Sequence, residues 1–215
     1  MRGLTKGTRF NTLSSPLHKA YKIRGVPMPL SNAVSRKAIH TREIQCRGYQ
    51  RDDGLWDIEG HLVDTKAYSF ENRDRGMVGA GQPIHDMWVR LTVDDDLVVR
   101  EAEATTDASP FAICGSITGR IKELEGLTVA KGWTKQVHAR LGNTLGCTHI
   151  THMLTGPLAT TVFQTIMPIK NRKTWDEGVK PKEKPFVIDT CHALASDGEV
   201  VKSRWPEFYT GSDKI

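Results

Sequence analysis

The chain has 215 residues, 38% of them hydrophobic and 26% charged, which is the composition of a globular domain with a buried core. No apolar run approaches the roughly 18 residues that cross a bilayer. Residues 1–40 also lack the continuous apolar stretch of a secretory signal peptide. We therefore expect a cytoplasmic protein that has no membrane partner.

The positive charge of the chain is concentrated at its start. The formal net charge is +5, but residues 1–40 contain eight Lys or Arg and no Asp or Glu, which leaves 22 basic and 25 acidic side chains in the rest. A nucleic-acid-binding domain spreads basic residues over a face of its fold, so nucleic acid is not the expected partner. We expect residues 1–40 to form a basic, irregular arm outside the core, either free or lying on a partner such as a second copy of the chain.

The cysteines form no recognisable framework. Four cysteines are spread over 215 residues with no Cys-x-x-Cys pair, which excludes a disulfide-dense scaffold and a zinc ribbon. We expect reduced thiols.

After the arm, apolar and polar residues alternate as they do in strands. Strands are expected from residue 41 and over residues 55–70, 84–93 and 97–106. Asp52-Asp53-Gly54 is typical of a hairpin turn, and a Gly-rich loop is expected at 71–82. Because short connections favour pairing of sequential strands, the sequence predicts a four-stranded antiparallel meander.

The second half of the chain has helical spacing of its apolar residues. Helices are expected over residues 113–124, 133–141 and 147–166. Pro157 should kink or restart the last of these, and Thr148 is its expected N-cap. Strands followed by helices predict an α+β fold.

The domain organisation follows from these patterns. The core is expected at 41–167, after the arm of residues 1–40. Residues 168–185 are rich in Lys and Pro and predict a surface linker, and residues 186–215 predict a tail that docks on the core.

Two neighbouring strands carry polar faces that can either face solvent or line a cavity. Glu59 and His61 share one face of the second strand with Asp57. The opposite face of the second strand is apolar, which fits a polar face that simply lies in solvent. In the cavity interpretation the third strand supplies a matching wall, in which Arg90 pairs with an acid and Trp88 and Trp56 enclose an aromatic ligand.

The remaining candidates lie where elements begin. His85-Asp86 opens the third strand after the Gly-rich loop, a common place for a site. Cys114 is expected near a helix N-terminus, where the dipole favours a thiolate, although a lone Cys is also a common small core residue. Cys147 and His149 begin the next helix and can present sulfur and nitrogen to one metal or act as thiolate and base. We expect His85, Asp86, Cys114, Cys147 and His149 to converge.

Several long motifs resemble the bacterial domain-of-unknown-function family 2889. They are RGYQRDDGLWDIEGHLVD (47–64), PIHDMWVRLTVDDDL (83–97), LGCTHI (145–150), LATTVFQTI (158–166) and DTCHALASDG (189–198). The resemblance covers about residues 38–210 and departs from the family pattern at Gly115, where members tend to have Pro. It implies a role in the catabolism of lignin-derived aromatics, with formaldehyde-releasing lyase activity on phenylcoumaran-type compounds.

A more distant similarity is to NifU-like iron–sulfur scaffold proteins, over residues 83–166. Strands precede helices, and candidate ligands stand at three points: at His85-Asp86, at Cys114 and at Cys147 with His149. His85 stands where that pattern has Cys, which speaks against cluster assembly. The similarity implies that the three points meet in space.

Three functions remain open at this point. The first is a lyase that needs no cofactor, in which His85, His149, Asp86, Glu59 or His61 supplies acid–base groups and Arg90 holds a substrate anion. The second is an accessory protein for metal or sulfur handling that binds a single ion, zinc being the expected one, through ligands at Asp86, Cys114, Cys147 and His149. The third is a non-catalytic binding module.

Overall fold

The computed structural model describes residues 30–176 and 181–212. The chain divides into two units, residues 1–37 and residues 38–215. Most of the predicted basic arm lies outside the described residues, and so do residues 177–180 of the predicted linker. The features below all belong to the second unit.

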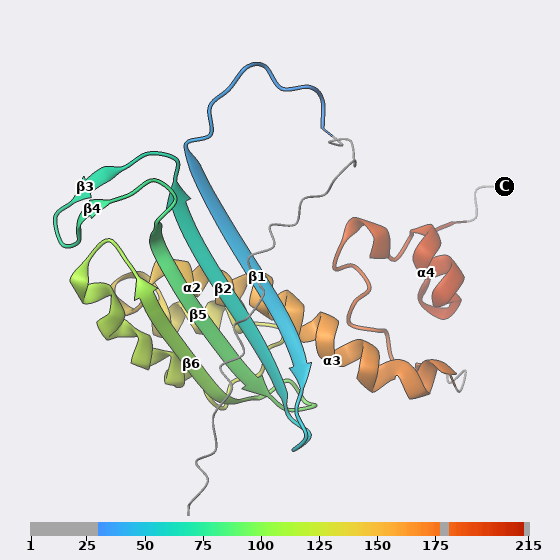
Figure 1. Cartoon of the computed structure of the whole chain (residues 1–215). Coiled ribbons are helices and arrows are strands. Elements are labelled where there is room, and N and C mark those ends of the chain that lie inside the picture. Colours follow the sequence, from blue (N-terminus) through green and yellow to red (C-terminus); the bar gives the residue numbers. More distant parts are fainter. Residues whose placement is uncertain (1–29, 177–180, 213–215) are drawn as a thin grey trace, which may run out of the picture. The chain divides into compact units, whose positions relative to one another are not determined.

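Four long strands form one antiparallel sheet with the order β1-β2-β5-β6 (Figure 1). The strands are β1 (His40–Gln50), β2 (Trp56–Lys66), β5 (Pro83–Val93) and β6 (Val99–Ala108). The predicted meander is confirmed.

The face that each strand buries follows from its alternating sequence. Along β2 the buried residues are Trp56, Ile58, Gly60, Leu62 and Asp64, while the residues between them are half-buried. Because side chains alternate across a strand, these five project from one face of the sheet. Asp64 is therefore a carboxylate in a position that the pattern reserves for apolar side chains.

The segment predicted as a Gly-rich loop contains a small hairpin. Strands β3 (Phe70–Asn72) and β4 (Gly76–Val78) pair antiparallel around Asn72, whose Oδ1 accepts hydrogen bonds from the backbone amides of Asp74 and Arg75. Three-residue strands carry too little alternation to be recognised in sequence. The flanking glycines still act as turn residues, since Gly76 and Gly81 have φ values of 70° and 79°.

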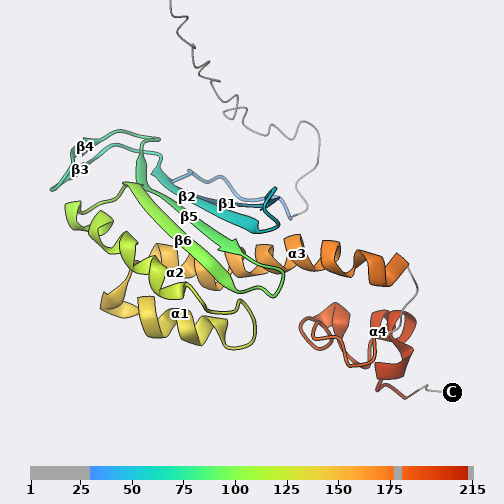
Figure 2. The ribbon, with the colours of Figure 1, turned by 90° about the horizontal axis from the view of Figure 1, so that it is seen from below.

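Helices follow the sheet and cover one of its faces. They are the 3₁₀ helix η1 (Ala112–Leu124), α1 (Trp133–Leu141), the 3₁₀ turn η2 (Asn143–Leu145), α2 (Thr148–Thr155) and α3 (Pro157–Asp176). In Figures 1 and 2 helices α2 and α3 lie against the same face of the sheet, and no helix of the described residues covers the opposite face. We call the two faces the helix face and the open face. The α+β class is confirmed.

The last predicted helix is divided where Pro157 was expected to restart it. Helix α2 ends at Thr155 and α3 begins at Pro157, because proline fits the first turn of a helix but cannot continue one. The predicted N-cap was one residue late: Cys147, with an extended backbone, precedes α2, and Thr148 is its first helical residue.

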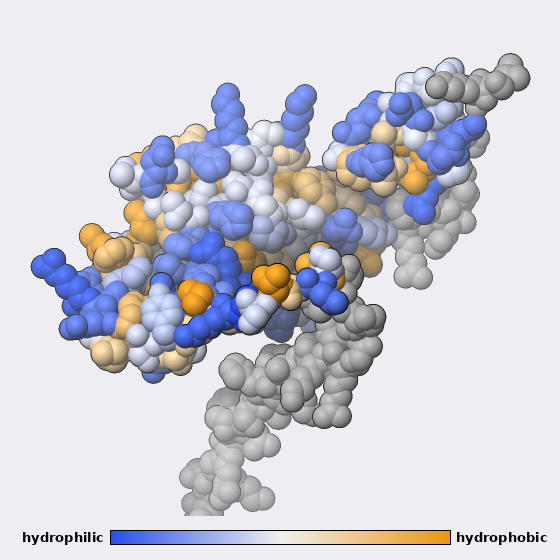
Figure 3. Space-filling model, turned by 90° about the horizontal axis from the view of Figure 1, so that it is seen from above, coloured by the Kyte–Doolittle hydropathy of each residue, from blue (hydrophilic) through white to orange (hydrophobic). Residues whose placement is uncertain are grey.

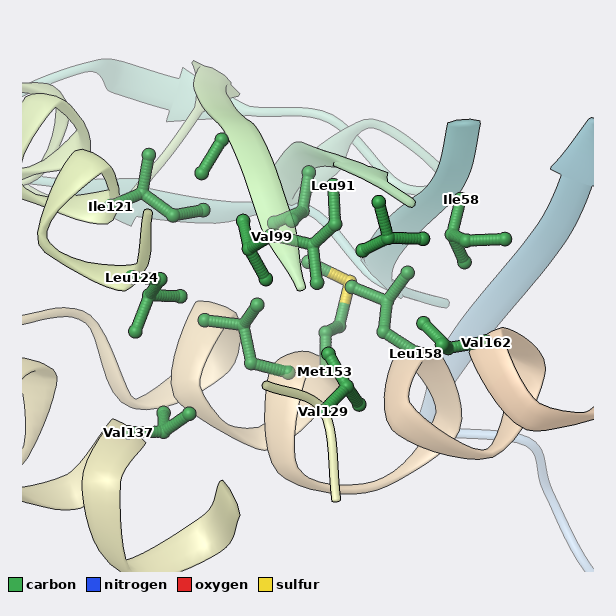
Figure 4. Close-up of a cluster of buried hydrophobic side chains, with 14 of the residues drawn as sticks. Ile58, Leu91, Val99, Ile121, Leu124, Val129, Val137, Met153, Leu158 and Val162 are labelled. Atoms are coloured by element: carbon green, nitrogen blue, oxygen red, sulfur yellow. The ribbon is translucent and has the colours of Figure 1, made fainter. Parts of the chain in front are cut away.

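The core fills the space between the helix face and helices α1 to α3. Figure 4 shows side chains from the sheet, such as Ile58, Leu91 and Val99, meeting Met153, Leu158 and Val162 of the helices. Helix α3 approaches the sheet at Gly60, where an added Cβ would lie 3.1 Å from Leu158 Cδ1. A glycine at this point lets the helix axis come close to β2.

Helix α3 extends past the predicted end of the core into the C-terminal part of the chain. Helix α3 runs through Pro168 to Asp176 and so occupies the first part of the predicted linker. Beyond the linker lie η3 (His192–Leu194), α4 (Glu199–Arg204) and η4 (Pro206–Phe208). The ring of Phe186 lies 5.5 Å from that of Phe163 in α3; docking of the rest of the tail stays a prediction.

Among the described residues, no helix combines the length and hydropathy needed to cross a membrane.

Candidate functional site

A cross-strand row of polar residues interrupts the apolar helix face near one end of the sheet. Arg42 of β1 is directly opposite Asp64 of β2, and Asp64 is directly opposite His85 of β5. Residues paired in this way project from the same face, so all three side chains lie on the helix face.

Asp64 is the centre of this row. Its side chain is only 1% exposed, and four donor atoms surround its two oxygens. Arg42 donates from Nε to Oδ1 and from Nη2 to Oδ2, each over 2.7 Å, in the two-pronged geometry that a guanidinium favours. His40 Nε2 lies 3.2 Å from Oδ1, and His85 Nδ1 lies 2.8 Å from Oδ2.

The surroundings keep Asp64 ionised. Burial raises the pKa of the carboxyl group, but the hydrogen bonds and charges of Arg42 and His85 outweigh it and hold the pKa at about 2. At neutral pH the carboxylate can only accept hydrogen bonds, so Nδ1 of His85 must carry the proton. In the neutral form of His85, Nε2 is then the nitrogen that carries no proton.

Nε2 of His85 is also accessible. It has no hydrogen-bond partner in the described part of the chain. Every buried side-chain nitrogen or oxygen in that part has a partner, so an atom without one is not buried. An unprotonated and accessible imidazole nitrogen is the form that takes up a proton.

Helix α2 brings a second imidazole to the row. His149 stands in its first turn, with its ring centroid 3.9 Å from that of His85 and its Nε2 3.9 Å from Oδ2 of Asp64. Burial lowers the pKa of His149, and the charges of His85 and Arg42 lower it further, to about 4. His149 is therefore neutral at physiological pH.

Cys147 lies beside this pair of histidines. Its Sγ is 3.7 Å from Nδ1 of His149 and 3.9 Å from Sδ of Met87. Of the five residues expected to converge, the structure thus gathers His85, Cys147 and His149.

Asp86 belongs to the opposite face, which corrects the predicted convergence. Adjacent residues of a strand project to opposite sides, so Asp86 points away from His85. It accepts a hydrogen bond from His61 Nε2 over 2.7 Å, and the His61 ring stacks on Trp88 with centroids 3.7 Å apart. The open face therefore holds a second His–Asp pair made by the same two strands.

Cys114, a predicted metal ligand, also lies outside the group of potential ligands that the structure brings together. It lies in η1, where its amide donates to the carbonyl of Phe111. In residues 30–176 and 181–212, Asp64, His85 and His149 are the group whose ligand atoms all lie within 4.8 Å of one another. Asp86, Cys114 and Cys147 of the predicted ligand set do not belong to that group. The prediction relied on positions at the starts of elements and did not consider toward which face of the sheet a residue points.

The predicted aromatic wall is also divided between the two faces. Trp56 is 4% exposed in the core, where its Nε1 donates to Asp95 Oδ1, whereas Trp88 is 37% exposed on the open face. The two side chains cannot enclose one ligand. The predicted pairing of Arg90 with an acid is present: its guanidinium donates to Glu59 over 2.8 and 2.9 Å and to Glu103 over 3.3 Å.

A cavity of about 400 Å³ is lined by residues of β2, β5, β6 and η1 and by Arg51. Its lining includes Arg90, Asp57 and Arg51, but Arg90 is paired with Glu59, and Arg51 with Asp53 and Asp57. Groups that neutralise one another leave little to bind or activate a substrate. We therefore place the candidate site at the Asp64 row and not at this cavity.

The end of the sheet that carries the row points upward in Figure 1, and Figure 3 views the molecule from that side. Hydrophobic residues there are scattered among hydrophilic ones. The side chains of His85 and His149 are 15% and 22% exposed, so a ligand can reach both imidazoles from solvent.

The sequence prediction missed three members of this site: Asp64, Arg42 and His40. One signal was available for Asp64, because it continues the buried series Trp56, Ile58, Gly60 and Leu62. A carboxylate in such a series requires a buried cation or donor. No comparable pattern marks Arg42 or His40.

Comparison with known proteins identifies a family but no relative of known activity. The family described as "Protein of unknown function (DUF2889)" matches residues 40–164. No curated protein and no solved structure matches the chain, so the NifU-like similarity gains no support. The matched segment includes the whole Arg42–Asp64–His85 row and His149. The chain belongs to the DUF2889 family.

Proposed function

We propose that this protein is a small-molecule lyase that releases formaldehyde from a hydroxymethyl group of a lignin-derived, phenylcoumaran-type aromatic compound. The reaction is a retro-aldol-like cleavage. The base removes the proton of the hydroxyl group and the carbon–oxygen bond becomes the carbonyl of formaldehyde. The carbon–carbon bond breaks, its electron pair moves to the conjugated carbon, and a proton is returned there. No oxidant or reductant is consumed, so no redox cofactor is required.

The observation that carries this proposal is the Asp64–His85 pair. A carboxylate fixed by Arg42 holds His85 in the tautomer whose Nε2 is free to accept the hydroxyl proton. In the proposed reaction His149, whose ring lies against that of His85, relays to the carbanionic carbon the proton that His85 has taken from the hydroxyl group. In this assignment His85 and His149 keep catalytic roles predicted from the sequence, whereas Glu59, His61 and Asp86 belong to the open face.

The expected partner is the aromatic substrate itself. We also propose a cytoplasmic location, because all four cysteines are free and free thiols persist in a reducing compartment.

The test compares the two His–Asp pairs, which lie on opposite faces of the sheet and have similar contact distances of 2.8 and 2.7 Å. The full chain is incubated with a panel of hydroxymethyl-bearing phenylcoumarans, and released formaldehyde is trapped and quantified. His85→Asn should lower the rate by about a hundredfold or more, the usual contribution of a general base. His61→Asn, which removes the matched 2.7 Å contact to Asp86, should leave the rate within about threefold.

Three results are informative. Loss of activity in His61→Asn alone would move the site to the open face. Equal loss in both variants with folded protein would indicate a structural cause. Absence of formaldehyde across the panel would refute the lyase proposal.

A single divalent ion at Asp64, His85 and His149 is the second candidate function, favoured by the spacing of these ligand atoms. The distances of 2.8 and 3.9 Å from Asp64 Oδ2 to the two histidine nitrogens can be spanned by donors that each lie about 2.1 Å from one ion. Zinc suits nitrogen and oxygen donors, and two histidines with one carboxylate form a set that leaves positions for substrate. When bound, the ion would polarise a substrate oxygen.

Metal analysis of the purified protein tests this candidate separately. Stoichiometric zinc that is lost in His85→Ala and His149→Ala but kept in Cys114→Ala and Cys147→Ala would support it. Metal content unaffected by His85→Ala, or lost in the cysteine variants, would contradict this ligand set. Full activity of the metal-free protein would exclude a catalytic metal and leave acid–base catalysis as the mechanism.

A further inference from the structure

The two edges of the main sheet differ in how their backbone is covered. At the β6 edge, Val99 donates to the carbonyl of Leu127 and accepts from the amide of Gly126, each over 2.8 Å. Helix η1 packs along the rest of β6. The start of this edge is therefore paired with backbone of the same chain, and η1 lies beside the rest.

The β1 edge is bare in the described part of the chain. All 11 residues of β1 pair with β2, and no described residue outside β2 hydrogen-bonds to the backbone of His40–Gln50. The strand contains no proline. Its register with β2 is unbroken, whereas the β2–β5 and β5–β6 pairings each contain a register shift. Proteins usually protect a long edge strand with a proline, a bulge or a covering segment, and β1 has none of these among the described residues.

We propose that β1 pairs antiparallel with β1 of a second copy of this chain, around a twofold axis at Gln45. Residues 40–50 are centred on residue 45. This register therefore pairs the whole strand, with His40 opposite the partner's Gln50. About ten backbone hydrogen bonds would join the copies and turn two four-stranded sheets into one continuous sheet.

The charges on the open face fit this register. Pairing within the chain already places Glu103, Arg90, Glu59 and Arg47 in one row across β6, β5, β2 and β1, with alternating sign. In the proposed register the partner's Glu43 lies next to Arg47 and continues the alternation. Glu43 has no ion-pair partner among the described residues. By symmetry the contact occurs twice.

The helix face fits the same register. Ile44 and the partner's Cys46 lie opposite one another, and in each chain both side chains pack against the edge of the core. A shift of the register by two residues places Glu43 opposite the partner's Gln45 or Tyr49 and leaves strand ends unpaired. The full-length register is thus also the one with complementary charges and continuous apolar packing.

The test is the mass of the full chain in solution, measured by light scattering and sedimentation at micromolar concentration. We expect twice the chain mass of 24.0 kDa. Glu43→Arg sets Arg against the partner's Arg47 at two places and should weaken the dimer by roughly ten- to a hundredfold. Arg47→Glu should do the same by opposing the partner's Glu43.

Mixing the two variants supplies the decisive measurement. In a mixed pair each Glu43→Arg position faces an Arg47→Glu position, so two monomeric proteins should combine into a heterodimer. Glu103→Arg, a reversal at the far end of the same charge row, is the control and should remain dimeric. Circular dichroism of each variant confirms that it is folded.

A symmetric cross-link fixes the register independently. Gln45→Cys lies opposite itself and should form a disulfide-linked dimer under mild oxidation, identified by mass spectrometry of the bridged peptide. Tyr49→Cys faces the partner's Thr41 and should not. A monomeric chain, or a dimer that is unchanged in both charge variants, would overturn the proposal; the latter is the result expected if residues 1–37 hold the copies together.

Discussion

Replacing Arg42 by leucine is the sharpest test of how the site is held. The substitution removes both hydrogen bonds from the guanidinium and leaves a carboxylate that is 1% exposed without its main cation. The pKa of Asp64, about 2 against an ordinary 3.8, corresponds to about 2 kcal/mol of stability at neutral pH. Without Arg42, burial is opposed by His85 alone among these two partners, so the pKa of Asp64 should rise and a cost of this size or more is expected. We expect about 2–4 kcal/mol, because half-exposed Arg42 makes the pair less buried than the most costly examples.

The pH dependence of this stability loss distinguishes the explanation from a simple loss of packing. In the wild type the folded pKa is depressed, so the stabilisation is present above pH 3.8 and is lost as pH falls through about 2. In Arg42→Leu the raised pKa means that Asp64 is protonated at mildly acid pH, where the penalty of burying its charge disappears. The difference between variant and wild type should therefore shrink between pH 7 and pH 4.

Urea denaturation at several pH values measures both quantities. The control is Arg100→Leu, which removes the exposed partner of Asp94 and should cost less than about 1 kcal/mol. Arg42→Leu costing no more than Arg100→Leu, or a loss that is constant from pH 7 to pH 4, would refute the assignment of Asp64 as a buried, Arg-compensated charge.

Three further predictions concern neighbouring parts of the molecule. The lowered pKa of His149, about 4 against 6.5, means that the unfolded chain binds more protons between these values, so up to about 3 kcal/mol of stability is lost as pH falls from 6.5 through 4. His149→Asn should abolish this acid sensitivity in thermal unfolding, and exposed His152→Asn should not. Trp56→Phe, which deletes the hydrogen bond to Asp95, should cost about 1–3 kcal/mol in urea titrations without changing activity, and a selective loss of activity would return Trp56 to the site. Gly60→Ala brings a Cβ to 3.1 Å from Leu158 and should cost about 1–3 kcal/mol, whereas Gly115→Ala meets nothing within 4 Å and should be nearly neutral; equal effects on the unfolding midpoint would contradict the close approach of α3.

Local patterns were sufficient to predict most of the fold. Alternation identified the four long strands because β2 and β5 each bury every second residue over much of their length. Pro157 marked the break between α2 and α3, since proline acts through its own ring and needs no distant contact. The hairpin β3–β4 was missed because three residues per strand give no usable period.

The candidate site was only partly predictable, and the face of the sheet explains why. His85 and Asp86 were treated as one motif because they are adjacent, but adjacency in a strand sends them to opposite faces. Their true partners, Asp64 and His61, stand more than 20 residues earlier in β2.

The sequence by itself therefore determined the elements, their order and the presence of reactive side chains, because these depend on neighbours within a few residues. Only the tertiary structure decided which side chains meet. Cross-strand register set Arg42, Asp64 and His85 in one row, and the packing of α2 on the sheet added His149 to that row. Register and packing depend on contacts between distant segments, so the chemistry of this protein arises where the sequence alone is least informative.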